Sequence, residues 1–259
     1  MGSEMCIRDR NDIYPPAGRD AVQLASLMVS TVPQPITTKP ELGLVRGYAT
    51  PTTQYPVVFV GTGRYLGPSD VLNTVQQSVY AIKDPLDGVG VGDVRGTPVS
   101  SCTGANKFVK QNLIVSGTGK FTVSNNPVDF AFNCGWYLDF SAAPNPAGER
   151  VNVDPKLQLG VLAVATNIPE KSICTVGGTS WLYFFDYRGY TGTLESPPAV
   201  VGQLIGNAIA VGINTYKLPD GRVVSTVTTS DDKHPVFANP DLGLIGATTK
   251  RVLWRELLN

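Results

Sequence analysis

The fold class is clearest from residues 56–64, PVVFVGTGR, and from the segment that returns at 78–82, SVYAI. A short apolar run bounded by proline and glycine is typical of a strand that is covered on both faces. Gly61 and Gly63 suit a bulge or a sharp bend where that strand ends. The second segment is rich in β-branched and aromatic residues, which also favours a strand. Together the two segments predict neighbouring strands joined by a polar excursion.

The composition favours a β protein without long helices. Of the 259 residues, 16% are charged and 42% are hydrophobic, while 27 glycines and 20 prolines supply many turns. The 21 basic and 21 acidic residues balance, and no long run of like charge occurs, so no nucleic-acid-binding surface is evident. No apolar run approaches the roughly 20 residues that span a bilayer, and membrane insertion is therefore not expected.

Roughly ten to thirteen strands are expected along the chain, with hairpins at Gly117-Thr118 and at Asp220-Gly221. An apolar face over residues 21–29 predicts one short helix, which the prolines from Pro33 onward would end. No helix is expected after residue 40. Strands at this frequency suit a sandwich, a barrel or a propeller, and no strict repeat of about 40 to 45 residues is legible.

Three blocks of sequence in order carry a family resemblance. The first is residues 56–67 with 76–84; the second runs from 135–139, GWYLD, through 148–150, GER, to 174–183, CTVGGTSWLY; the third is 251–257, RVLWREL. Over roughly residues 40–259 the chain resembles the C-terminal β-propeller domain of the PilC/PilY1 family, the tip-associated adhesins and assembly factors of bacterial type IV pili. The structural-motif residues that this resemblance implies are Gly61, Gly63, Arg64, Trp136, Asp139, Trp181 and Trp254.

The resemblance implies an all-β fold, an irregular β-propeller. A complete ring of seven four-stranded blades needs roughly 28 strands, so the chain is expected to hold only the C-terminal blades of a larger propeller. Residues 5–10, MCIRDR, resemble the translation of a sequencing-library adapter. We therefore expect residues 1–10 to be non-native and 11–259 to be the C-terminal part of the propeller domain. The alternative is a genuine but disordered tail.

Three cysteines remain when Cys6 is set aside, an odd number for a protein that the resemblance places outside the cytoplasm. One disulfide with a free thiol, or a partner cysteine in upstream sequence, would fit this number. We expect Cys134 to pair with Cys174, because each lies beside a motif block and a disulfide can close a loop of about forty residues. The spacing matches no zinc pattern, since Cys-x-x-Cys is missing and His234 is the only histidine.

Gly61-Thr62-Gly63-Arg64 invites comparison with a phosphate-binding loop, because glycine lets backbone amides approach an anion. The Lys-Ser/Thr pair of a P-loop is missing, so a bend at the end of a strand is expected instead. Arg64 is then expected to pair with a carboxylate such as Asp84. The aromatic strands containing Trp136, Tyr137 and residues 181–185 could stack on sugars, but packing between blades is the favoured interpretation.

No catalytic motif supports an enzyme. The acidic residues are scattered, and His234 lies in a loop-like segment with no Gly-x-Ser-x-Gly elbow elsewhere. The PilC/PilY1 family carries a short calcium loop of the Asp-x-Asp-x-Asn/Asp type. That pattern is missing here, and in the family it lies upstream of the Gly-Thr-Gly-Arg block. No catalytic, cofactor-binding or metal-binding residue is therefore expected in this chain.

By resemblance, the chain is expected to be a fragment of a non-enzymatic type IV pilus tip-associated protein. The implied roles are pilus biogenesis, control of retraction, surface adhesion and twitching motility, at the extracellular pilus tip or the outer-membrane-associated cell surface. The implied partners are minor pilins and a host or abiotic surface, without nucleic acid or a membrane span. The alternative is a propeller-fold enzyme, such as a quinoprotein-like dehydrogenase or a glycan hydrolase.

Overall fold

Strands account for nearly all regular structure in this computed structural model. The structure describes residues 4–7, 22–47, 50–96, 102–104, 107–140, 148–170, 177–189, 200–220 and 222–238. Within these ranges the one helical element is α1 (Pro68–Val71), a single turn in the polar excursion that follows the Gly-Thr-Gly-Arg segment. The all-β expectation is confirmed. The described part of the chain contains no helix with the length and apolarity needed to cross a membrane.

A five-stranded sheet contains the two strands predicted first. Its order is β5 (Glu41–Arg46), β6 (Gln54–Gly61), β7 (Ser78–Lys83), β12 (Gly135–Asp139) and β9 (Phe108–Gln111). Neighbours pair antiparallel except at one edge, where β9 runs parallel to β12. Every residue of β7 is buried, as expected for a strand that is covered on both faces.

A six-stranded sheet packs against this one. Its order is β10 (Leu113–Gly117), β11 (Lys120–Val123), β16 (Gly202–Gly206), β15 (Gly178–Asp186), β14 (Val161–Pro169) and β13 (Lys156–Gln158). The predicted hairpin at Gly117-Thr118 is confirmed, and it joins β10 to β11. After β9 the chain thus leaves the five-stranded sheet, adds this hairpin to the six-stranded sheet, and returns as β12.

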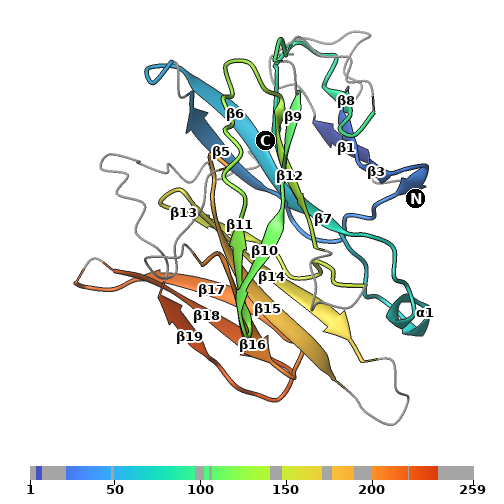
Figure 1. Ribbon diagram of the computed structural model, residues 1–259, viewed down its shortest axis with the longest axis vertical. Coiled ribbons are helices and arrows are strands. Elements are labelled where there is room, and N and C mark those ends of the chain that lie inside the picture. The colour runs from blue at the N-terminus through green and yellow to red at the C-terminus, as the bar shows by residue number, and fades with distance from the viewer. Residues whose placement is uncertain are drawn as a thin grey trace, which may run out of the picture.

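Smaller sheets flank the two large ones. Beyond the six-stranded sheet lie β17 (Ala210–Lys217), β18 (Val223–Thr229) and β19 (Val236–Ala238). On the other side lie the sheet β1 (Glu4–Ile7), β2 (Val22–Ser26) and β8 (Gly92–Asp93), and the pair β3 (Met28–Val29) and β4 (Val32–Pro33). The hairpin expected around Asp220 is confirmed between β17 and β18. Figure 1 shows β17–β19 and the strands β1, β3 and β8 at opposite ends of the molecule.

The helix expected over residues 21–29 is wrong, because this segment forms β2 and β3. β2 pairs with β1 and β8. The side chains in and directly after β2 that pack against the five-stranded sheet are Leu24, Ala25 and Leu27. Burial against a sheet outweighs the weak helical periodicity of a short apolar segment.

Three cores separate the successive layers. The central core lies between the two large sheets and contains Phe59, Trp136, Trp181 and Tyr183. Trp136 is 1% exposed and Trp181 is 4% exposed, which confirms internal packing for these two side chains, whereas Tyr137 is only half-buried. On the remaining faces, Tyr80 and Ile82 pack toward β2, while Ala163 and Leu182 pack toward β17 and β18. The large sheets are therefore covered on both sides, and the molecule is built of sheets stacked face to face.

Candidate functional site

The glycine motif marks the place where the second sequence block crosses the first. A Cβ at Gly61 would lie 2.5 Å from a methyl carbon of Val151, and one at Gly63 would lie 2.5 Å from the Cβ of Arg150. Gly63 also has φ of 145°, which side-chain-bearing residues rarely adopt. Between them the Thr62 carbonyl accepts a hydrogen bond from the Val151 amide at 2.9 Å. The glycines thus permit close backbone contact between two sequence blocks.

Arg150 fixes this crossing from within. Its side chain is buried, and its guanidinium donates to the carbonyls of Arg64, Asp70, Asn73 and Gly148 at distances from 2.5 to 3.0 Å. Burial lowers the pKa of Arg150, and the charge of Asp70 partly opposes that effect. The guanidinium therefore holds the polar excursion and α1 against the second block.

Arg64 pairs with Asp70, and the expected pairing with Asp84 is wrong. Arg64 Nε lies 2.8 Å from Asp70 Oδ1, while the amides of Leu66 and Gly67 donate to Oδ2. These hydrogen bonds, the one from Leu66 foremost, lower the pKa of Asp70 despite its burial. Asp84 follows the opposite end of β7, out of reach of Arg64, and accepts a hydrogen bond from the amide two residues on.

The disulfide joins Cys102 to Cys134, with Cα atoms 5.5 Å apart, so the expected pairing of Cys134 with Cys174 is wrong. Cys134 lies directly before β12. Both cysteines are buried in the core that contains Tyr80. Cys174 and Trp254 lie outside the described residues.

A polar network occupies that same face of the five-stranded sheet. Ser78 lies opposite Asp139, Tyr80 opposite Tyr137, and Tyr137 opposite Lys110 in the strand register. Side chains alternate along each strand, so these five residues point to one face, while Trp136 and Leu138 point to the central core. The network is therefore assembled from β7, β12 and β9.

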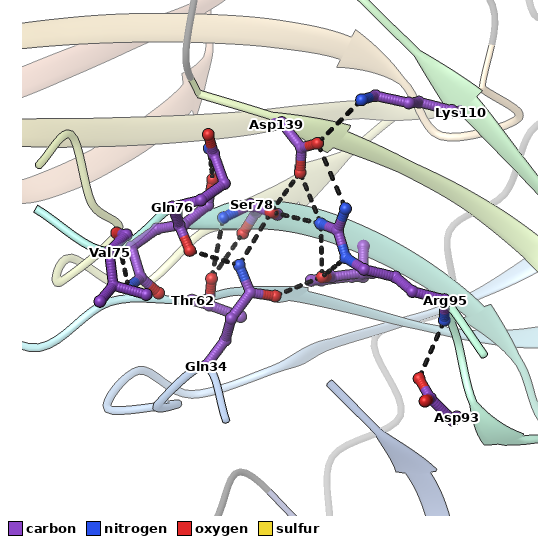
Figure 2. Close-up of polar contacts among 11 residues, drawn as sticks. Gln34, Thr62, Val75, Gln76, Ser78, Asp93, Arg95, Lys110 and Asp139 are labelled. Carbon is purple, nitrogen blue, oxygen red and sulfur yellow. Dashed lines mark hydrogen bonds and ion pairs between the residues drawn. The ribbon is translucent and has the colours of Figure 1, made fainter. Parts of the chain in front are cut away.

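Arg95 reaches into the network from the segment after β8 (Figure 2). Its Nη2 lies 2.5 Å from Asp139 Oδ1, and its Nη1 lies 3.2 Å from Oδ2. The guanidinium also donates to the Tyr80 hydroxyl and stands 4.3 Å from the ring centroid of Tyr137. Lys110 Nζ approaches Asp139 Oδ2 from the other side at 3.1 Å. Asp139 thus joins two cations.

The remaining donors and acceptors are matched. Ser78 Oγ donates to Asp139 at 2.6 Å and accepts from Arg95 Nη2 at 2.8 Å and from Gln34 Nε2 at 3.0 Å (Figure 2). The Tyr80 hydroxyl in turn donates to Gln34 Oε1. A satisfied network of this kind fixes its side chains in one arrangement.

The same contacts keep the charges of the network constant around neutral pH. Burial alone would raise the pKa of Asp139, but hydrogen bonds from Arg95 and Ser78 outweigh it and lower the pKa. Burial alone would lower the pKa of Arg95, but the hydrogen bonds and charge of Asp139 outweigh burial and raise this pKa. Burial raises the pKa of Tyr80 to about 12. Its partners therefore stabilise the Asp139 side chain as a carboxylate.

An open depression of about 650 Å³ borders the network at the β9 edge. Its lining combines two aromatic rings, of which Tyr137 is half-buried and Phe108 buried, with one lysine and with amide and aliphatic groups: Phe108, Val109, Lys110, Asn112, Asn126, Pro127, Asn133 and Tyr137. Sequence reasoning singled out Asp139 and Tyr137 but missed Arg95 and Lys110. The alternation of β9 and β12 could have grouped Lys110 with Tyr137, whereas no local pattern marked Arg95.

The comparisons with curated proteins and with solved structures point to proteins of the same name. No family model matches the chain. Two curated relatives, each named a type IV pilus biogenesis factor PilY1 homolog of Xylella fastidiosa (strain Temecula1), are 26% identical over 192 residues and 27% identical over 221 residues. These alignments cover 71% and 78% of this chain but only 12% and 16% of the relatives.

A solved structure has the same fold. The crystal structure of the Pseudomonas aeruginosa PilY1 C-terminal domain matches with a TM-score of 0.60 and 21% identity. The match covers 85% of this chain and 49% of that one. The first two sequence blocks converge at Arg150 and Asp139 within this fold, and both curated relatives carry the same name. The chain is thus similar to PilY1 homologs in sequence and to a PilY1 C-terminal domain in fold.

Proposed function

We propose that this chain is a binding part of a type IV pilus biogenesis factor and is not an enzyme. The observation that carries the proposal is the agreement of two curated PilY1 homologs with a fold match to a PilY1 C-terminal domain over 85% of the chain. Because the chain spans 12% and 16% of those relatives, the proposal concerns the contribution of this part to a larger protein.

The architecture supports a scaffold of propeller blades. The sheets follow one another face to face, each with a separate core toward its neighbour, which is how adjacent blades pack in a propeller. The chain covers 49% of the matched domain. We therefore propose that additional blades, supplied by the rest of the protein, complete an irregular β-propeller.

The carboxylates of the polar network and of the excursion around α1 support binding in preference to catalysis. The carboxylate of Asp139 is held by Arg95, Lys110 and Ser78, and its lowered pKa makes it a poor general acid. The carboxylate of Asp70 is likewise occupied by Arg64 and by backbone amides. These acidic groups order loops that present a surface.

On this proposal the protein acts at the pilus tip or the adjoining cell surface, with minor pilins and an adhesive surface as partners. It promotes assembly, opposes retraction, and so supports adhesion and twitching motility. A strain that carries the complete gene with the codons for residues 22–238 deleted tests this proposal. The expected result is loss of shearable surface pili and of twitching zones.

The same deletion in a background without the retraction motor separates the two roles. Recovery of surface pili there indicates that the segment opposes retraction, whereas continued loss indicates a role in assembly. The matched control carries Gly67→Ala, since a Cβ there would meet nothing within 4 Å. Normal piliation, twitching and adhesion in the deletion strain, with the shortened protein detected at the cell surface, would refute the proposal.

A further inference from the structure

The depression at the β9 edge has the composition of a carbohydrate site. Its volume of about 650 Å³ lies within the range of small-molecule pockets. Tyr137 contributes an aromatic ring, and Asn112, Asn126 and Asn133 contribute amides. A pyranose offers a C–H face to an aromatic ring and hydroxyls that pair with amide donors and acceptors.

Several polar groups of this lining are available to a ligand. Asn126 Nδ2 donates to the Lys110 carbonyl at 2.7 Å, which leaves its Oδ1 as an acceptor. Within the described part of the chain, neither the Tyr137 hydroxyl nor the Asn112 carboxamide has a hydrogen-bond partner, and Asn112 is exposed. Tyr137 can thus offer a hydroxyl beside the ring on which a sugar would stack.

The aromatic platform is already ordered. The Arg95 guanidinium lies 4.3 Å from the ring centroid of Tyr137, and the Tyr80 ring lies 5.9 Å away in a stacked arrangement. Arg95 is itself fixed by Asp139, as Figure 2 shows. Because the ring is held before any ligand arrives, binding would cost little side-chain entropy.

The groups that remain for a ligand are uncharged, which favours a neutral ligand. Lys110 is the cation that lines the depression, and it already contacts Asp139, which Arg95 also contacts. Arg95, Lys110 and Asp139 together carry a net charge of +1, but each is engaged in this network. The lining groups left for a ligand are therefore the Tyr137 hydroxyl and the amides of Asn112 and Asn126. We propose that this depression binds a neutral glycan, with Tyr137 as the stacking platform and Asn112 and Asn126 as hydrogen-bonding groups. This inference deepens the proposed surface-binding role and rests on it.

Saturation-transfer NMR and titration calorimetry on the full 259-residue chain test the inference. The neutral probes are chitotriose, lactose and mannotriose, and a heparin-derived tetrasaccharide is the acidic probe. We expect at least one neutral probe to bind and to contact Tyr137. Tyr137→Phe and Asn112→Ala should each weaken that binding about 2- to 10-fold, since each removes one hydrogen-bonding group. Tyr216→Phe, at a half-exposed tyrosine on β17, is the matched control and should not change it.

Unchanged thermal unfolding of the variants shows that any loss of binding is local. Three results would overturn the inference: no neutral probe binds, only the acidic probe binds, or the variants bind as tightly as the parent chain. Piliation of a strain that carries Asn112→Ala separates this test from that of the proposed function. Normal pili with lost glycan binding support both proposals, whereas normal pili with unchanged glycan binding reject only the glycan site.

Discussion

Removal of the Cys102–Cys134 disulfide should destabilise the protein more than any surface change. The bond closes a loop with a sequence separation of 32 residues. In the chain-entropy model a loop of this length lowers the entropy of the unfolded chain enough to contribute about 3.7 kcal/mol at room temperature. For a chain of this size that corresponds to a decrease of roughly 7–15 °C in the unfolding midpoint.

The assay is urea unfolding of the double variant Cys102→Ala/Cys134→Ala, with the free energy obtained by linear extrapolation. Replacement of both cysteines avoids leaving one buried thiol without its partner. The reduced parent chain is the first control, and it should lose a similar free energy. Cys174→Ala is the second control, and it should leave the free energy of unfolding nearly unchanged, because Cys134 is bonded to Cys102.

Two results would refute this reasoning. One is a loss of less than about 1 kcal/mol in the double variant, well below the stabilisation typical of native disulfides. The other is an equal loss in Cys174→Ala, which would restore the pairing that the sequence suggested. Mass spectrometry of the unreduced, proteolysed chain would identify the bonded pair independently.

The remaining predictions concern the crossing of the blocks and the polar network. Gly63→Ala should lower the free energy of unfolding by about 2–4 kcal/mol in a urea titration, because its Cβ would meet Arg150 at φ of 145°. Gly67→Ala, with open space around its Cβ, should change it by less than about 1 kcal/mol, and equal losses would contradict the packing. Arg150→Met should cost at least about 3 kcal/mol in the same assay, since four carbonyls lose their donor; a loss below about 1 kcal/mol would show that water replaces it. The pKa of Asp139 is lower in the folded protein than its unfolded value of about 4, so its carboxylate contributes stability above that pH, and this stability is lost as the pH falls further. Asp139→Asn should therefore make the thermal unfolding midpoint depend less on pH below about pH 4. An unchanged pH dependence would exclude this contribution.

Much of the sheet structure could be predicted from local sequence. β6 follows from an apolar run that ends at glycine, β7 follows from β-branched and aromatic residues, and the hairpin at Asp220 follows from its turn residues. The helix prediction at 21–29 failed because the apolar spacing there suits a helix and a strand equally, and burial of Leu24 and Leu27 favours the strand.

The functional side chains were harder to predict because their partners are distant in sequence. Asp70 lies within the excursion that follows Arg64, but the sequence could not show that this excursion folds back on itself. Arg95 and Asp139 come from a loop and a strand that are 44 residues apart, and only the tertiary fold brings them together. Cys102 and Cys134 meet for the same reason.

The hairpin between β9 and β12 has a consequence for how the molecule unfolds. β9 and β12 belong to one large sheet, yet the hairpin β10–β11 between them belongs to the other. Because β10 and β11 follow β9 and precede β12 in the chain, separating the two sheets would also disrupt the strand pairing of this hairpin or of its flanking strands. The two sheets should therefore form one cooperative unit, with slowly exchanging amide protons in β11 and β12 released by the same opening event. Such interleaving requires contacts between distant parts of the chain before either sheet is complete, and folding should be correspondingly slow.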